Sequence, residues 1–398
     1  MNFDTRLATR KRAGLLGGWI LGLLMLACSK PPLDAPRRDG SAASATTAMA
    51  NARAFPAAEK FFRNDRRWLG ADGASTIPLD EKRTLWLFGD TFVAKTGAFL
   101  RNESEMVRNS IAIQNGAILE VAGGSFRWKR DADATPASFF PERGDRWYWP
   151  GHGLRVPKGP LIVFLFKLRA TPNVGLGFAS DGHAIAWIDN PDDDPDDWRV
   201  VVRDQATPPF DFLPATAVVV DERHVVAVAI RQSGTHAGSL VRWTVDGLAK
   251  GDMSSEEWWA GDEAGWRSLI ALPKSGPVEV FDDAGAECSL HWDQAEKRWI
   301  HVASYGFGAT TIGLRSASRL VGPWSTPTTI YRPPESDGPK PFVYAAKAHP
   351  ELRASPTSAD LVVTYATNSF DFGDLFAPEK CDVLYWPRVV LVRRPLCR

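Results

Sequence analysis

Short apolar runs recur along the chain at nearly even intervals, separated by Gly, Pro and Asp turns, while apolar residues at helical spacing are almost absent. Five of these runs are strongly apolar and rich in β-branched or aromatic residues, and they begin 76, 64, 74 and 62 residues apart. Short apolar runs bounded by turn residues are typical of strands, so the pattern predicts an all-β chain. The five runs are residues 85–88, 161–166, 225–230, 299–303 and 361–365.

Each apolar run belongs to a longer repeated unit, in which an opening segment precedes the run and, in four units, a third strand follows it. A period this long fits one four-stranded sheet per unit, with the sheets arranged around a central channel. We therefore predict a five-bladed β-propeller with four-stranded blades. A two-sheet sandwich is the alternative, but it does not explain the even spacing. The opening segments are residues 70–75, 149–153, 215–218, 287–290 and 347–351.

The first 28 residues have the features of a lipoprotein signal peptide. Basic residues precede an apolar run at residues 13–27, which is shorter than the roughly 20 apolar residues that cross a membrane. The run ends at Ala27-Cys28, which resembles a lipobox, although Met25 stands where Leu is usual. We expect lipidation at Cys28 and an exported lipoprotein anchored to a membrane of the bacterial cell envelope. A soluble secreted protein and an uncleaved anchor are the alternatives.

Composition divides the remainder of the chain in two. Residues 29–54 are rich in Ala, Ser, Pro and Arg without a period, which predicts a disordered tether, and residues 55–398 form the predicted propeller. The 47 basic and 47 acidic residues balance, so nothing indicates a nucleic-acid partner. Three cysteines remain after export: Cys288, Cys381 and Cys397. Either Cys381 and Cys397 form a disulfide, or all three are thiols.

Ionisable residues occupy equivalent places in several opening segments, which in a propeller line the channel. Hydrolysis of a glycosidic bond needs two carboxyl groups across the scissile bond. Asp72 and Asp90 are the leading pair, because they lie on adjacent predicted strands and each stands beside a glycine that lets a sugar approach the backbone. Glu287 is the third candidate. Other channel positions carry His152, Thr216, Lys347 and His349.

Structural roles are the alternatives for these residues. Asp72 could make an Asx turn, Asp90 could cap a strand end, and Glu287 could pair with Lys347 or a channel arginine. His152 and His349 could hold a channel cation or bind sugar hydroxyls, but lone histidines beside Gly and Pro are more often structural. No spacing supports zinc, and we predict no cofactor and no metal. The acidic run at residues 192–197 lacks the alternation of a calcium loop and is interpreted as a solvated loop.

Short strings resemble known propeller families. Gly89-Asp90-Thr91-Phe92, followed by Arg108-Asn109-Ser110, resembles the bacterial domains of unknown function 4185, some of which are endo-D-arabinanases. Residues 322–327 resemble an outer-strand turn of the five-bladed glycosidases of family 43. These resemblances imply a sugar-cleaving propeller with an acidic pair near Asp90. Glu287-Cys288 also resembles the acid motif of sucrose-cleaving five-bladed enzymes, but it falls in the fourth blade rather than the third.

Aromatic and polar residues near the predicted channel complete the site. Indole and phenol rings stack on the apolar faces of sugars, and hydrogen-bonding side chains bind the hydroxyls. The predicted function is a surface- or periplasm-anchored glycoside hydrolase acting on a pentose-rich or related polysaccharide. A non-catalytic carbohydrate-binding lipoprotein and a scaffold that binds a protein partner are the alternatives. The predicted substrate-binding residues are Asn109, Trp149, His152, Tyr344, Lys347 and His349.

Overall fold

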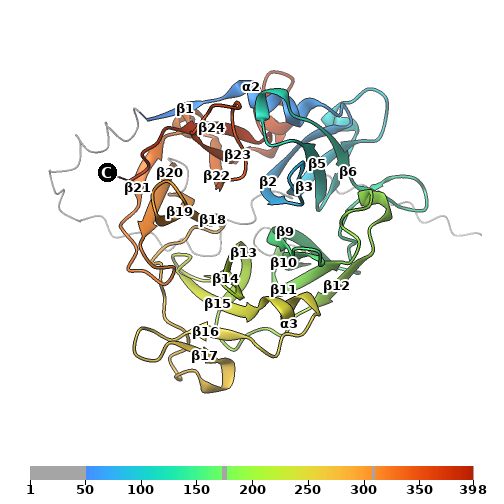
Figure 1. Ribbon diagram of the computed structural model, residues 1–398. Helices are drawn as coiled ribbons and strands as arrows, with labels where there is room; N and C mark the ends of the chain where they lie inside the picture. Colours follow the sequence, from blue (N-terminus) through green and yellow to red (C-terminus); the bar gives the residue numbers. More distant parts are fainter. Residues whose placement is uncertain (1–50, 173–176, 307–309, 398) are drawn as a thin grey trace, which may run out of the picture.

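A computed structural model describes residues 51–172, 177–306 and 310–397. Five antiparallel sheets stand around a common axis, as Figure 1 shows, so the predicted five-bladed propeller is confirmed and the sandwich is excluded. The predicted apolar runs lie in the second strands of the five blades: β3 (Arg83–Ala94), β10 (Leu161–Ala170), β14 (His224–Arg231), β19 (Arg298–Tyr305) and β23 (Leu361–Ser369). The predicted signal peptide, Cys28 and most of the predicted tether lie outside the described residues. Within those residues, we find no helix whose length and apolar character would let it span a membrane.

The strands of each blade follow one another from the axis outward. Blade 1 contains β2 (Trp68–Pro78), β3 (Arg83–Ala94), β5 (Ser110–Asn115) and β6 (Gly123–Arg127), with β4 (Ser104–Val107) also paired to β3. Blade 2 contains β9 (Arg146–Arg155), β10 (Leu161–Ala170), β11 (Phe178–Ile188) and β12 (Val200–Asp204). Blade 3 contains β13 (Phe212–Asp221), β14 (His224–Arg231), β15 (Gly238–Thr244), β16 (Glu257–Trp259) and β17 (Trp266–Ser268).

Blades 4 and 5 complete the ring. Blade 4 contains β18 (Cys288–Asp293), β19 (Arg298–Tyr305), β20 (Thr311–Ala317) and β21 (Thr328–Tyr331), and blade 5 contains β22 (Pro341–His349), β23 (Leu361–Ser369), β24 (Arg388–Val392) and β1 (Ala52–Ala54). A small hairpin joins β7 (Lys129–Arg130) to β8 (Pro136–Ala137). The helices are α2 (Pro56–Glu59), α3 (Val245–Ala249), and the 3₁₀ segments η1 (Lys60–Arg63), η2 (Arg101–Glu103), η3 (Leu119–Val121), η4 (Pro195–Asp197), η5 (Leu269–Ala271), η6 (Pro334–Asp337) and η7 (Phe372–Leu375).

Strand β1 closes the ring by adding the outermost strand to the last blade. Ala52 pairs with Val392 and Ala54 with Val390, so the two ends of the propeller share one sheet. The sequence had placed residues 52–54 in the tether, and this boundary is wrong. These three residues carry no strand signal of their own, and their extended conformation comes from the hydrogen bonds that the edge of β24 offers.

The core lies between the blades. Neighbouring blades enclose apolar clusters, for example one in which Phe164 and Trp187 of blade 2 pack with Ala227 and Trp243 of blade 3. A second strand therefore packs apolar side chains on both of its faces. This explains why residues 161–166 are an unbroken apolar run and do not alternate.

The structure answers two questions that the sequence left open: the state of the cysteines and the surroundings of the acidic run. Cys288, Cys381 and Cys397 are all free thiols, so the disulfide between Cys381 and Cys397 is not formed. The acidic loop at residues 192–197 is braced by arginines, since Arg155 reaches Asp192 at 3.0 Å and Arg127 reaches Asp196 at 3.4 Å. Because Arg127 belongs to blade 1 and the loop to blade 2, the second of these pairs links neighbouring blades.

Candidate functional site

Backbone irregularities in strand β2 position Asp72, the first of the two candidate carboxyl groups. Strand β2 shifts register against β3 on both sides of Gly73, next to Asp72, and Gly73 and Ala74 both have positive φ, at 84° and 62°. Ala217 of β13 and Ala345 of β22 are also left-handed, at 44° and 56°. Such bulges bend a strand and redirect its side chains, and here they occur midway along the strands that line the channel.

Asp72 is held by two tyrosines from blade 5. The Tyr344 hydroxyl donates to Asp72 Oδ2 at 2.8 Å, and the Tyr385 hydroxyl contacts the same oxygen at 3.4 Å. On the other side stands Gly89, where an added Cβ would meet Asp72 Oδ1 at 2.4 Å. Burial, with the nearby charges of Asp90 and Glu287, raises the pKa of Asp72 to about 8. This shift favours the protonated form of Asp72 at neutral pH.

Asp90 is the second carboxyl group, and cationic and polar donors surround it. The Trp149 indole N–H donates to Asp90 Oδ1 at 2.8 Å, and the Arg108 guanidinium lies 3.5 Å from Oδ2. Burial raises the pKa of Asp90, while Arg108 and the Trp149 donor oppose this effect by favouring the carboxylate. Asp72 and Asp90 therefore have different surroundings. Tyrosine hydroxyls contact Asp72, whereas a guanidinium and an indole N–H contact Asp90.

Glu287 pairs with Lys347, as one alternative from the sequence predicted. Lys347 Nζ donates to Glu287 Oε2 at 2.6 Å and to the Gly73 carbonyl at 2.9 Å, and both side chains are largely buried. This ion pair joins blades 4 and 5 to the bulge that carries Asp72. Glu287 therefore acts on Asp72 through its charge and through Lys347.

Tyr385 and Arg101 belong to this site, and sequence reasoning missed both. Tyr385 lies in the connection between β23 and β24, and no periodicity marks it. Arg101 is buried and donates to three carbonyl oxygens, those of Leu69 at 2.8 Å, Leu375 at 3.1 Å and Leu384 at 2.8 Å. These bonds fasten the connection to blade 1 and so position Tyr385 over Asp72.

Three predicted substrate-binding residues have structural partners instead. Asn109 is fully buried, donates to the carbonyls of Phe140 and Tyr148, and accepts from the Phe140 amide, so both of its amide hydrogens are already used. His152 accepts from the Val218 amide at 2.8 Å, which leaves its Nε2–H to donate to the Thr76 carbonyl.

His349 contacts the hydroxyls of Thr76 and Thr364 through its two ring nitrogens. Burial lowers the pKa of His349 to about 3 and that of His152 to about 4, so both rings are neutral. Neither histidine is hydrogen-bonded to the carboxyl pair. Of the predicted residues, the structure brings Trp149, Tyr344 and Lys347 together around Asp72, Asp90 and Glu287. No cluster of three or more His, Cys, Asp or Glu side chains suited to a metal occurs among the described residues.

The raised pKa of Asp72 makes a prediction about stability that does not depend on activity. The folded state holds this proton up to about pH 8, whereas the ordinary pKa is 3.8, so stability is lost as the pH rises between these values. Asp72→Asn is expected to raise the thermal midpoint relative to the parent, and the gain should grow from about pH 4 to about pH 8. A gain that is absent, or constant across this range of pH, would contradict the raised pKa.

Sequence comparison places the chain in a family. The sequence model described as Domain of unknown function (DUF5005) matches residues 57–394, which is nearly the whole propeller. The chain belongs to the DUF5005 family. The resemblance to domain of unknown function 4185 was wrong at the level of family, because the strings around Asp90 and Asn109 are too short to separate one propeller family from another. No curated protein has a sequence that matches this chain.

Solved structures share the architecture of this DUF5005 propeller. A candidate hydrolase from Bacteroides ovatus is 16% identical, has a TM-score of 0.68, and matches over 86% of this chain and 90% of its own. The GH62 α-L-arabinofuranosidase of Coprinopsis cinerea is 11% identical with a TM-score of 0.46, over 83% and 92% of the two chains. The endo-arabinase of Bacteroides thetaiotaomicron is 12% identical with a TM-score of 0.40, over 82% and 95%. At 16% identity the likeness to the Bacteroides ovatus protein is one of fold.

Proposed function

We propose that this chain is a glycoside hydrolase that cleaves a pentose-rich or related polysaccharide with Asp72 and Asp90. The observation that carries the proposal is the contrast between the two carboxyl groups. Tyr344 and Tyr385 hydroxyls contact Asp72, whose pKa burial raises to about 8, whereas Arg108 and Trp149 donate to Asp90 and oppose the rise that burial causes in its pKa. Glycoside hydrolysis needs one neutral and one ionised carboxyl group, and different environments are the usual way to obtain them.

In the proposed reaction Asp72 is the general acid. Its proton passes to the glycosidic oxygen as the bond to the anomeric carbon breaks, while the Asp90 carboxylate attacks that carbon or takes a proton from an attacking water. The Tyr344 and Tyr385 hydroxyls then stabilise the Asp72 carboxylate by donating to it. Glu287 assists from its ion pair with Lys347. The Bacteroides ovatus protein of similar fold is described only as a candidate hydrolase, which is compatible with this class of reaction.

A panel of polysaccharides tests the proposal. The chain should release new reducing ends from at least one arabinose- or xylose-containing glycan, and the rate should fall as the pH rises through about 8, where Asp72 loses its proton. Analysis of the products identifies the sugar and the bond. Absence of turnover on every glycan, together with measurable binding of one, would refute the hydrolase and establish the carbohydrate-binding alternative.

We also propose that the propeller is exported and held at a membrane of the cell envelope through lipid on Cys28. Cys28→Ala is expected to move the protein from the membrane fraction to the soluble fraction, because the lipid chains are the proposed anchor. Cys381→Ala, which changes a cysteine of the propeller, is the matched control and should leave fractionation unchanged. Equal membrane association of the parent and Cys28→Ala would overturn the anchor.

A further inference from the structure

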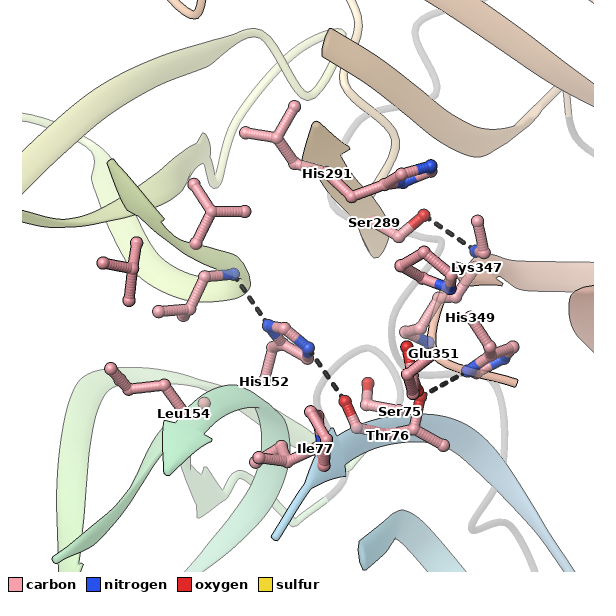
Figure 2. Close-up of a pocket in the computed structure, with 18 of the residues that line it drawn as sticks. Ser75, Thr76, Ile77, His152, Leu154, Ser289, His291, Lys347, His349 and Glu351 are labelled. Atoms are coloured by element: carbon pink, nitrogen blue, oxygen red, sulfur yellow. Dashed lines mark hydrogen bonds between the residues drawn. The ribbon is translucent and has the colours of Figure 1, made fainter. Parts of the chain in front are cut away.

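A cavity of about 380 Å³ lies in the channel on the far side of Lys347 from the carboxyl pair. Its walls include the last residues of β2, β9, β13 and β22 and most of β18, whereas Asp72, Trp149 and Tyr344 lie earlier on β2, β9 and β22. Figure 2 shows this part of the channel, with His152, Thr76, Lys347 and His349 around it. The volume is within the roughly 300–1,000 Å³ typical of small-molecule sites.

Two polar side chains of the cavity have buried atoms without a hydrogen-bond partner among the residues that the structure describes. Glu351 Oε1 is one of these atoms, and Figure 2 shows this side chain beside Lys347, His349 and Thr76. His291 is 7% exposed, and neither of its ring nitrogens has a hydrogen bond. Its nearest acidic atom, Asp293 Oδ2, is 3.8 Å away, which is too long for one. Buried polar groups are nearly always bonded, and Glu351 and His291 both line the cavity, so a ligand or water bound there can supply the missing hydrogen bonds.

The charges of the side chains that line the cavity limit the classes of ligand that could bind there. The cationic side chains of the lining are already compensated, since Lys347 bonds Glu287 at 2.6 Å and Arg155 bonds Asp192 at 3.0 Å. Burial raises the pKa of Glu351 and lowers that of His291, so both groups tend toward their neutral forms. A phosphate or a carboxylate would find no uncompensated cation here, and burial disfavours the charged form of Glu351 that an amine would need. An uncharged ligand with hydroxyl groups would satisfy both side chains.

Apolar surface forms the remainder of the wall. Leu154 and Leu290 line the cavity, together with the indoles of Trp292 and Trp299, whose ring centroids are 5.7 Å apart. A ring that carries hydroxyls at its edge and C–H groups on its faces matches such a lining. We propose that this cavity is a second, non-catalytic site that binds one neutral sugar unit, with Glu351 and His291 bonding its hydroxyls and Trp292 covering a face. This site does not depend on the proposed hydrolase activity.

Methyl NMR of the chain carrying Cys28→Ala, titrated with L-arabinose, D-xylose and D-galactose, tests the second site. Saturable shifts of the Leu154, Val218 and Leu290 methyl groups are expected with at least one sugar, at a Kd of about 1 mM or below. Glu351→Leu and His291→Phe should each weaken binding roughly tenfold, because each leaves sugar hydroxyls unpaired. Glu351→Gln retains a donor and an acceptor and should bind nearly as the parent does.

Matched controls separate this site from the carboxyl pair. His183→Phe changes another buried histidine with an unpaired ring nitrogen, outside the cavity, and should leave the shifts unchanged. Asp72→Asn should also leave them unchanged, so failure of the hydrolase proposal would not affect this result. No saturable shift with any of the three sugars, or equal affinity in folded Glu351→Leu and His291→Phe, would overturn the proposal and leave a cavity filled by water.

Discussion

Asp72→Asn and Asp90→Asn should each lower kcat on a cleaved glycan by roughly 10³-fold, in line with the 10²- to 10⁴-fold contribution of general acid–base catalysis. Asn preserves the shape of the side chain and its hydrogen bonds in part, but it can neither donate the proton of Asp72 nor act as the anion of Asp90. Both variants should still fold, Asp72→Asn with the raised thermal midpoint predicted above, and sugar affinity should remain close to that of the parent. The measurement is kcat and KM on the glycan identified by the polysaccharide panel.

Two further variants test whether the loss of activity is specific to Asp72 and Asp90. Glu287→Gln should cost less than either Asn substitution, because Glu287 acts through Lys347 and through its charge on Asp72. Asp204→Asn, a carboxylate at the surface bonded to Tyr148 and Lys167, should leave the rate unchanged. If the parent cleaves a glycan and both Asp72→Asn and Asp90→Asn retain nearly full rates, the class of enzyme is right and the site is wrong.

Gly70→Ala should destabilise the propeller by about 3 kcal/mol, since a left-handed non-glycine residue and a steric clash each cost about 1–3 kcal/mol. Gly70 has a φ of 115°, and an added Cβ would lie 2.2 Å from the Tyr385 carbonyl oxygen and 2.8 Å from Arg101 Nη2. The clash of the added Cβ is relieved only if the connection between β23 and β24 moves. That movement would displace the Tyr385 hydroxyl from Asp72, so activity should fall as well.

Gly97→Ala is the matched control for this substitution. Gly97 is exposed and has no atom within 4 Å of an added Cβ, so its replacement should change the free energy of unfolding by less than about 0.5 kcal/mol. Urea unfolding of both variants measures the difference. Equal stability of Gly70→Ala and the parent would show that the 370–387 segment is not held against blade 1 as the Arg101 contacts indicate.

The sequence by itself determined the number of blades and the position of their second strands. A strand that packs between two neighbouring blades is buried on both faces, so most of its positions are apolar, and runs such as residues 161–166 are visible without knowledge of the partner. The candidate carboxyl groups were found for a related reason. Asp72, Asp90 and Glu287 stand next to glycine or within opening segments, where an acidic residue interrupts an otherwise apolar strand pattern.

Tertiary structure alone decided which polar residues face the carboxyl pair. Asn109, His152 and His349 have the composition of sugar-binding residues, but the groups that they bond come from distant segments that no local pattern reveals. Tyr385 contacts Asp72 although the two residues are 313 positions apart in the sequence. Arg101 positions Tyr385 by donating to backbone carbonyl oxygens, and because every residue has a carbonyl oxygen, the sequence does not mark these partners. Local periodicity reports which face of a strand is buried, whereas these contacts depend on how loops meet when the ring closes.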